Sequence, residues 1–319
     1  MAQSTLIPGA RRKPTPALRE FKKYIKYGDL TLMLLPVIAY FIIFKYIPMG
    51  GIIIAFKDYK MGLGIAGSEW MGLEYYRTAF ANPFFKRAIS NTLIISSMKL
   101  LVGFPAPILL ALMLNEVRHS AYKRIVQTIS YLPHFLSWVI MAGILWQLLS
   151  VNNGAVNALL TQVFGRKEPI QFLIDNRYFR GTVVVSDVWK GVGWGSILYL
   201  ATISSIDPTL YEAAICDGAT RFQRVRYITL PSIMPTITIM LILNLGSILD
   251  AGFDQIFNLY SAAVYETGDI IDTYVYRIGM IEWNYKLSTA IGLFKNIIGF
   301  ILVAGTNVIA KRISGNGIW

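Results

Sequence analysis

The chain has 319 residues, of which 55% are hydrophobic, and its formal net charge is +12. Repeated apolar runs of about 20 residues or more exclude an ordinary soluble domain. One cysteine, Cys216, and two histidines, His119 and His134, provide neither a disulfide framework nor a zinc or haem ligand set. The sequence therefore predicts no metal site and no cofactor bound by this chain.

Six apolar runs are long enough to cross the roughly 30 Å hydrocarbon core of a bilayer as helices, which satisfy their own backbone hydrogen bonds. They cover about residues 30–56, 88–114, 125–149, 181–205, 232–257 and 288–310. The predicted fold class is an all-α membrane protein, with a six-helix transmembrane domain over residues 30–319.

Residues 1–29 form a basic tail ahead of the first run, with seven Lys and Arg: Arg11, Arg12, Lys13, Arg19, Lys22, Lys23 and Lys26. Basic residues concentrate on the cytoplasmic side of membrane proteins, so the tail is expected to be cytoplasmic. Six spans then make both termini cytoplasmic. The positive net charge has the same explanation, together with contact with anionic lipid, and we expect no nucleic-acid partner.

Three longer connections fall on the outer side in this topology, at residues 57–87, 150–180 and 258–287. The first contains residues 70–76, whose composition suits an amphipathic interfacial helix, and Asn152-Asn153-Gly154 in the second indicates a turn. Connections of this length suit docking of an extracytoplasmic protein, with simple linkage as the alternative.

Glycines and prolines interrupt several of the apolar runs. Gly191, Gly193 and Gly195 in the fourth run are expected to allow close helix contact or local bending. Kinks are expected at prolines within or beside the runs, namely Pro36, Pro105, Pro107, Pro133 and Pro235.

The connection between the fourth and fifth runs predicts two short helices. Asp207 before Pro208 indicates a helix start, because its side-chain oxygen can cap free amides and proline is tolerated at the first helical position. Gly218 suits a helix end, where a residue often adopts positive φ. The second helix is expected to carry Arg221, Arg224 and Arg226.

This connection, residues 207–231, resembles the cytoplasmic coupling loop of permease subunits in binding-protein-dependent ABC importers. The resemblance rests on Glu212-Ala213-Ala214, Gly218 and Ile228-Thr229-Leu230-Pro231, in the spacing E-A-A-x3-G-x9-I-x-L-P. It implies contact with a separate ATPase, and an ordinary basic inner loop is the alternative. The residues expected to couple are Glu212, Ala213, Ala214, Asp217, Gly218, Leu230 and Pro231.

Other stretches resemble the sugar-permease branch of this family: Ile47-Pro48 to Asp58-Tyr59, Leu132-Pro133, and Asp187-Val188-Trp189-Lys190-Gly191. Residues 244–249 and 252–258 are similar to the first permease of complex-polysaccharide and oligosaccharide importers, the group that includes the alginate transporter. The resemblance implies a type I importer in a bacterial plasma membrane. Its other parts would be a second permease, an ATPase homodimer that binds ATP and Mg, and an extracytoplasmic solute-binding protein.

The chain itself is not expected to be an enzyme. It contains no Gly-Lys dipeptide and therefore no G-x-x-x-x-G-K-[ST] phosphate-binding loop. ATP hydrolysis would fall to the partner subunits.

Ionisable residues in the apolar runs cost about 2.5–3.5 kcal/mol at mid-bilayer and usually face protein or water. They are Lys45, Lys99, Asp187, Lys190, Asp250, Asp254 and Lys295. The spacing puts Asp187 with Lys190, and Asp250 with Asp254, on shared helical faces. Lys99 and Lys295 are expected to pair with aspartates, and contact with an acidic sugar is the alternative.

The resemblance implies substrate contacts on the fourth and fifth runs. The candidate pathway residues are Lys190, Gly191, Trp194, Asn244, Ser247, Ile248, Asp250 and Asp254. The expected substrates are oligosaccharides, with acidic, alginate-type sugars as one possibility and neutral sugars left open. The alternative function is an ion-coupled secondary transporter, which predicts inverted repeats that the sequence does not display.

Overall fold

The computed structural model describes residues 28–166 and 168–314, and within these ranges it is helical, with no β-strand. Its extended pairing there is an isolated antiparallel bridge between Lys57 and Trp70. The all-α class is thereby confirmed. Most of the predicted basic tail, residues 1–27, lies outside the described residues. The chain divides into two units, residues 1–53 and 54–319, and each is described by itself.

The first unit contains one long apolar helix. It consists of α2 (Gly28–Phe41), the π-helical turn η1 (Ile42–Tyr46), α3 (Ile47–Met49) and the first residues of the 3₁₀ helix η2 (Gly50–Phe56). The wide turn precedes Pro48, and Ile47 N–H bonds to the Ile42 carbonyl, five residues back. Proline has no N–H and crowds the carbonyl four residues before it, so the wider turn allows the helix to continue.

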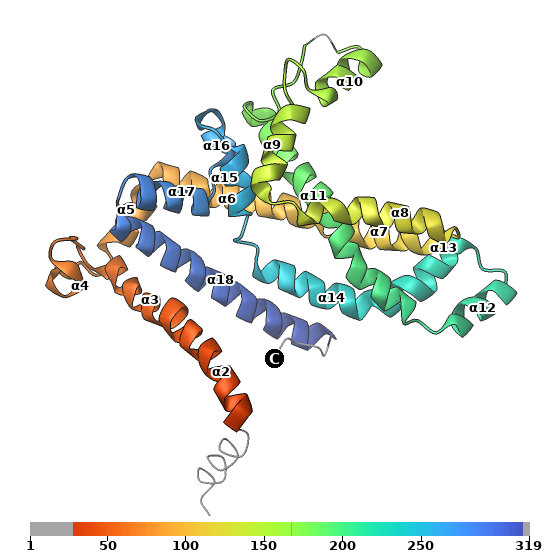
Figure 1. Ribbon diagram of the computed structural model, residues 1–319, viewed down its shortest axis with the longest axis horizontal. Helices are drawn as coiled ribbons and strands as arrows, with labels where there is room; N and C mark the ends of the chain where they lie inside the picture. Colours follow the sequence, from red (N-terminus) through yellow and green to blue (C-terminus); the bar gives the residue numbers. More distant parts are fainter. Residues whose placement is uncertain (1–27, 167, 315–319) are drawn as a thin grey trace, which may run out of the picture. The chain divides into compact units, whose positions relative to one another are not determined.

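The second unit contains the remaining helices, coloured from orange to blue in Figure 1. In chain order they are α4 (Gly64–Gly67), α5 (Glu74–Ala81), α6 (Pro83–Gly103), α7 (Pro105–Glu116), α8 (Ser120–Tyr131), η3 (Leu132–Phe135), α9 (Trp138–Leu148), α10 (Ala155–Phe164), α11 (Asn176–Ser204), α12 (Pro208–Cys216), α13 (Arg221–Arg224), η4 (Val225–Thr229), α14 (Leu230–Gly246), α15 (Phe253–Leu259), η5 (Ala262–Val264), α16 (Tyr265–Gly268), α17 (Ile271–Tyr276), η6 (Arg277–Ile281) and α18 (Tyr285–Ser314).

Four helices of the described chain are long and apolar enough to cross a membrane: Gly28–Phe56, Pro83–Glu116, Arg221–Gly246 and Tyr285–Val308. They correspond to the first, second, fifth and sixth predicted runs. The third run is bent, because Ser120–Phe135 and Trp138–Leu148 meet at 109°. The bend follows from extended backbone at Leu136 and Ser137, after which Ser137 caps α9 by accepting a hydrogen bond from Ile140 N–H.

The fourth predicted run corresponds to α11, which has 29 residues but does not meet the same criterion of length and apolar composition. Glycines, serines and charged side chains dilute its apolar residues. Helices α6, α7, α8 and α14 pack against it. A helix face that other helices cover does not have to be apolar to lie in a membrane, which explains the polar residues on this helix. By this criterion the described chain has four spans, or five with the bent pair.

The fifth predicted run ends earlier than expected. Helix α14 stops at Gly246, and α15 starts at Phe253 after a turn in which Gly252 has a φ of +90°. That conformation favours glycine and interrupts the helix. Asp250 and Asp254 therefore do not share a helical face, and that prediction was wrong. Asp250 lies in the turn, whereas Asp254 lies in the first turn of α15.

Ion pairs connect α18 to the loop that follows η2 and to α17. Lys286 Nζ lies 2.6 Å from Asp58 Oδ1, and the Tyr75 hydroxyl donates to the same oxygen at 2.9 Å. These hydrogen bonds, that of Lys286 first, lower the pKa of Asp58 to about 2. Lys295 Nζ lies 2.6 Å from both carboxylate oxygens of Asp272. Lys295 thus pairs with an aspartate, as predicted, and the aspartate comes from the last long connection.

Small residues on α11 allow neighbouring helices to approach closely. A Cβ added to Gly193 would lie 2.1 Å from the Ser130 carbonyl oxygen on α8, and one added to Gly195 would lie 2.9 Å from Pro107 Cγ. A Cβ at Gly191 would have no atom within 4 Å. The predicted close helix contact is therefore made at Gly193 and Gly195, but not at Gly191.

Replacing Gly193 by Ala should destabilise the permease domain, because the obstructing atom is a backbone carbonyl that cannot swing aside. We expect a loss of about 1–3 kcal/mol, the usual cost of overpacking, and a lower thermal midpoint in detergent. Gly181→Ala is the matched control, since Gly181 lies on the same helix with no atom within 4 Å of the added Cβ. It should leave the midpoint unchanged or raise it, and equal losses in both variants would contradict the packing role.

Candidate functional site

The helix at the start of the 207–231 loop forms as its sequence predicts. Asp207 Oδ1 accepts a hydrogen bond of 3.0 Å from Thr209 N–H, and Pro208 occupies the first helical position of α12. This backbone hydrogen bond, together with one from the Thr209 side chain, lowers the pKa of Asp207 below its usual range. The helix start is thus held by a charged cap.

Gly218 ends this helix in a left-handed conformation, with a φ of +76°. Gly218 N–H bonds to the Ile215 carbonyl at 3.0 Å, and Ala219 N–H bonds to the Ala214 carbonyl at 2.9 Å. These two bonds form a Schellman motif, in which the residue with positive φ is usually glycine. The direction in which the chain leaves α12 is therefore set by Gly218.

The second predicted helix is the beginning of a longer one. Thr220 and Gln223 form a capping box at its start, and Arg221–Gly246 then runs as a single helix through the π-helical turn η4. In that turn Leu230 N–H bonds to the Val225 carbonyl, five residues back, just before Pro231. The wide turn accommodates the proline without ending the helix. The prediction of a separate second short helix is therefore wrong.

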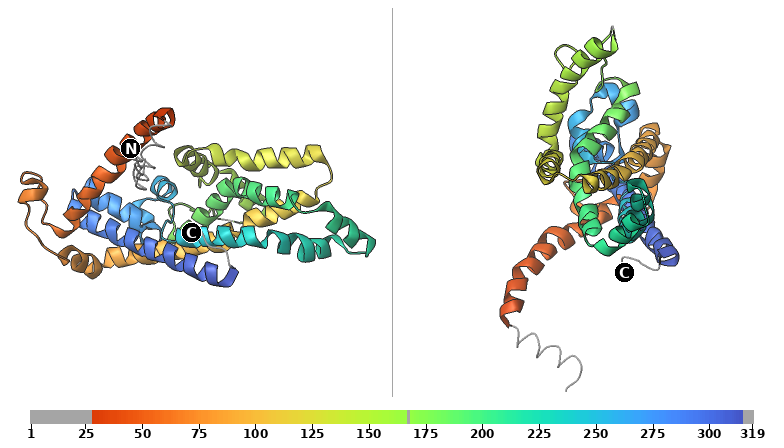
Figure 2. Two further views of the ribbon diagram at one scale, coloured as in Figure 1. Left: turned by 90° about the horizontal axis from the view of Figure 1, so that it is seen from below. Right: turned by 90° about the vertical axis from the view of Figure 1, so that its right-hand side faces the viewer.

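The loop is connected to this long helix and exposes apolar side chains. The Tyr211 hydroxyl and Thr229 Oγ1 lie 2.9 Å apart, which links α12 to η4. Glu212, Ala213, Asp217 and Gly218 are exposed. So are the apolar side chains of Leu210, Ile215 and Phe222. In Figure 1 and in the left-hand view of Figure 2, α12 lies at the end of the second unit opposite to α5. An exposed apolar surface on a terminal projection is typical of a protein-binding site.

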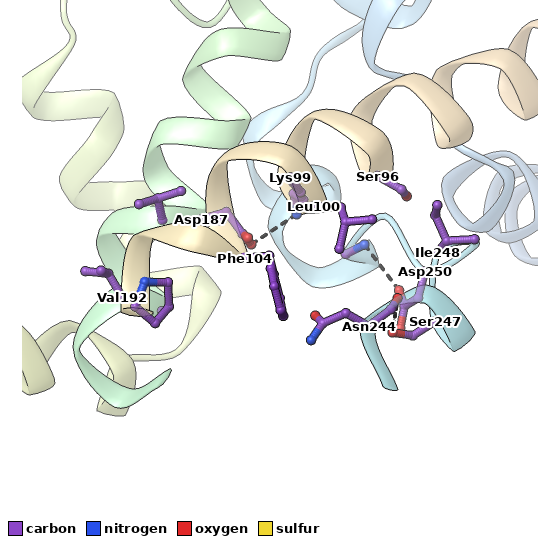
Figure 3. Close-up of a pocket in the computed structure, with 15 residues that line it drawn as sticks. Ser96, Lys99, Leu100, Phe104, Asp187, Val192, Asn244, Ser247, Ile248 and Asp250 are labelled. Carbon is purple, nitrogen blue, oxygen red and sulfur yellow. Dashed lines mark hydrogen bonds and ion pairs between the residues drawn. The ribbon is translucent and has the colours of Figure 1, made fainter. Parts of the chain in front are cut away.

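A polar cavity of about 320 Å³ lies beside α11, and we call it the central cavity. Its lining residues come from α6, α7, α11, α14 and the turn after α14: Ser96, Lys99, Leu100, Gly103, Phe104, Pro107, Asp187, Val188, Gly191, Val192, Asn244, Ser247, Ile248, Asp250 and Gly252. Figure 3 shows Asn244, Ser247 and Asp250 gathered on one side, with Lys99 and Asp187 from other helices nearby. Five predicted pathway residues line it: Gly191, Asn244, Ser247, Ile248 and Asp250.

Lys99, which lines this cavity, connects three other segments of the chain. Its ammonium group lies 3.1 Å from Asp187 Oδ1 on α11 and 2.9 Å from the Ala251 carbonyl oxygen, and it also donates to Gln255 Oε1 on α15. The Lys99 side chain is 13% exposed and that of Asp187 is 36% exposed. Lys99 therefore pairs with an aspartate, as predicted, and also supplies a donor to the turn that interrupts the fifth run.

Gln255 completes this network and was missed by the sequence analysis. It is fully buried, and its amide nitrogen donates to the Val183 carbonyl at 2.7 Å and to Ser186 Oγ at 2.9 Å. Asp250, Asp254 and Asn258 lie in the same stretch, so a polar residue there did not single out Gln255. A Cβ added to Gly252 would lie 2.8 Å from Lys99 Nζ, so glycine at this position also makes room for the ammonium group.

The remaining predicted pathway residues lie elsewhere. Lys190 and Asp254 line a second cavity of about 390 Å³, next to the bend between η3 and α9. Lys190 Nζ donates to the backbone carbonyls of Pro133, His134 and Leu136, and does not pair with Asp187. Trp194 is 48% exposed and stacks on His134, with ring centroids 4.5 Å apart. Asp187 and Lys190, which their spacing puts on a shared helical face, do not form an ion pair with each other.

The model of one protein family matches residues 103–315, and its description is "Binding-protein-dependent transport system inner membrane component". The chain belongs to this family. Members of the family are permeases, the membrane components of the transporter. They do not themselves hydrolyse ATP. The permease therefore has the type I ABC importer fold, as the resemblance implied.

Two relatives of the permease come from Bacillus subtilis (strain 168). Protein LplB is 47% identical over 290 residues, which are 91% of this chain and 91% of that protein. The polygalacturonan/rhamnogalacturonan transport system permease protein YteP is 43% identical over 318 residues, which are 100% of this chain and 98% of that protein.

One similar solved structure is that of a bacterial alginate ABC transporter in complex with an alginate pentasaccharide-bound periplasmic protein. The permease matches a chain of it with a TM-score of 0.86 and 44% identity, covering 94% of this chain and 100% of that chain.

Removing the Lys99 ammonium group should destabilise the permease, because the groups that accept its hydrogen bonds would be left without a donor. Lys99→Met leaves the Ala251 carbonyl and Gln255 Oε1 without this donor, and we expect a loss of about 3–5 kcal/mol. Asp187→Asn should cost less, because Asp187 is 36% exposed and water screens its charge.

The double variant Lys99→Met/Asp187→Asn gives the matched test, measured by unfolding in mixed detergent micelles. Its loss should be smaller than the sum of the two single losses by about 0.5–3 kcal/mol, the coupling typical of contacting charged residues. Additive losses would show that the two side chains do not stabilise each other.

Proposed function

We propose that this permease is the membrane-spanning subunit of an ATP-driven importer that takes oligosaccharides into a bacterium. It would form the translocation pathway with a second permease and work with an ATPase homodimer and an extracytoplasmic solute-binding protein. The observation that carries the proposal is the agreement over nearly the whole chain with a permease of an alginate importer. The name of YteP, which refers to polygalacturonan and rhamnogalacturonan, supports the same substrate class and keeps acidic sugars among the candidates.

We propose a six-span topology in the bacterial plasma membrane, with both termini in the cytoplasm. In it the bent pair of Ser120–Phe135 and Trp138–Leu148 is the third span, and α11 is the fourth. This topology puts the 207–231 loop on the cytoplasmic side and residues 57–87 on the outer side. The positions of α12 and α5 at opposite ends of the second unit support it (Figures 1 and 2).

The central cavity is proposed as part of the substrate pathway. Asn244, Ser247 and Asp250 are exposed on its wall in the single chain, so their polar groups are available to a substrate. The exposed indole of Trp194 offers an apolar face on which a sugar ring can stack. Lys190 and Asp254 would line the pathway at the second cavity.

The 207–231 loop is proposed to transmit ATPase movement to the membrane helices. Glu212, Ala213 and Ala214 would contact the ATPase, and the exposed Leu210 and Phe222 would add apolar contact area. Movement of α12 would reach the fifth span through the Gly218 turn and the Tyr211–Thr229 contact, because α13, η4 and α14 form one helix. Leu230 and Pro231 stand at the wide turn of that helix, and Asp217 precedes Gly218.

Purification of the tagged permease from its native host in mild detergent tests the assembly. We expect a second permease and an ATPase to co-purify, and uptake by the reconstituted complex to require ATP. Uptake by this chain alone that an ionophore abolishes would contradict the proposal and favour an ion-coupled transporter.

Gly218→Leu should uncouple ATP hydrolysis from transport while the permease still inserts and assembles. A leucine at positive φ costs about 1–2 kcal/mol, which would redirect α12 relative to α14. Sugar uptake per ATP hydrolysed by the reconstituted complex should fall to a small fraction of its normal value.

Gly165→Leu is the matched control for this substitution. Gly165 also has a positive φ, of +63°, with no atom within 4 Å of an added Cβ, but it follows α10. It should carry a similar local strain and keep its coupling. Normal coupling in Gly218→Leu, or equal uncoupling in both variants, would refute the lever role of the loop.

A further inference from the structure

The charged groups of the central cavity do not favour an acidic ligand. Two carboxylates, those of Asp187 and Asp250, and one ammonium group, that of Lys99, line it, so their formal charges sum to −1. The ammonium group has three protons, and three acceptors already surround it: Asp187 Oδ1, the Ala251 carbonyl and Gln255 Oε1. A substrate carboxylate would have to displace one of these acceptors to reach Lys99.

Most of the other side-chain donors of the cavity are also engaged, and one of the two Asn244 amide hydrogens remains free within the described part of the chain. Asn244 Nδ2 donates to the Met240 carbonyl at 2.7 Å, and Ser247 Oγ lies 3.2 Å from the Asn244 carbonyl and 3.3 Å from that of Leu243. Ser96 Oγ has no hydrogen-bond partner among the described residues, but it is buried beneath the cavity surface. The cavity therefore offers an incoming molecule few free side-chain donors.

Acceptors on the same surface remain free. Asp250 Oδ1 accepts a hydrogen bond of 3.2 Å from Gly252 N–H, and Asp187 Oδ1 accepts from Lys99. The second carboxylate oxygen of each aspartate, and the side-chain oxygen of Asn244, accept no hydrogen bond from the described residues. Asn244 and Asp250 are both exposed. Free carboxylate oxygens bind hydroxyl donors strongly, because the hydrogen bond is charge-assisted.

We propose that the part of the pathway built by this chain binds the hydroxyl groups of the sugar and disfavours its carboxylates, with Asp250 as the residue that sets this preference. The inference rests on the proposed function and specifies its substrate chemistry. If an acidic oligosaccharide is the cargo, its neutral, hydroxyl-bearing edge faces this chain, and its carboxylates lie away from Asp250.

The experiment compares uptake of a uronic acid trisaccharide with uptake of its methyl ester, by proteoliposomes that hold the complete complex and receive the solute-binding protein. The ester lacks the negative charges of the acid and otherwise differs from it only by its methyl groups. Each variant is compared with the unaltered complex, so discrimination by the binding protein cancels. Asp250→Asn should raise the ratio of acid to ester uptake by about tenfold, because it removes a negative charge that repels the carboxylates of the acid.

A second variant should change the ratio in the opposite direction. Asn244→Asp adds a carboxylate to the same wall and should lower the ratio of acid to ester uptake, which keeps the test valid if Asp250→Asn fails to assemble. Asp29→Asn is the charge-matched control, since Asp29 is exposed in the first turn of α2 and lies outside the central cavity. It should leave the ratio unchanged.

Unchanged ratios in both Asp250→Asn and Asn244→Asp, with both sugars still taken up, would overturn the inference alone. So would ester uptake that depends on Na⁺ and loses this dependence in Asp250→Asn, because the free oxygens would then hold a cation rather than hydroxyl groups. Uptake of neither sugar by the unaltered complex would overturn the proposed oligosaccharide import, and the inference with it.

Discussion

The arrangement of the central cavity depends on one ammonium group. Lys99 on α6 bonds to a carboxylate on α11, to the Ala251 carbonyl in the turn after α14, and to Gln255 at the start of α15. A turn inside an apolar bundle leaves backbone carbonyls without helical partners, and such groups are costly unless a donor reaches them. Lys99 supplies that donor, and so allows the fifth predicted run to break where the cavity forms.

The third predicted run breaks under the same constraint. The carbonyls of Pro133, His134 and Leu136 lie at its bend and accept hydrogen bonds from Lys190, which comes from α11. Charged residues in apolar runs often indicate a transport pathway, but these two lysines also satisfy backbone groups at helix breaks. A lysine held in this way is less available to a passing anion, which supports the proposed role of the free carboxylate oxygens in substrate choice.

The proposed coupling loop and the central cavity are built in different ways. The 207–231 loop has a charged cap at Asp207, a Schellman motif at Gly218 and a capping box at Thr220, all fixed by local backbone geometry. The central cavity combines residues more than 140 positions apart, such as Lys99 and Asp250. Local geometry suits the proposed movement of the loop as a unit, whereas a cavity between helices can change when those helices shift.

The sequence by itself determined the helical class, most of the long apolar helices, the start and end of α12, and the family, because these depend on local composition, caps and motif spacing. Tertiary structure alone decided the partners of Lys99 and Lys190, the separation of Asp250 from Asp254, and the role of Gln255. Helical periodicity assumes that a helix continues, so it could not reveal the breaks at residues 136–137 and 247–252. Those breaks are stable because side chains distant in sequence donate hydrogen bonds to the backbone carbonyls at the breaks. A local sequence pattern does not contain this information.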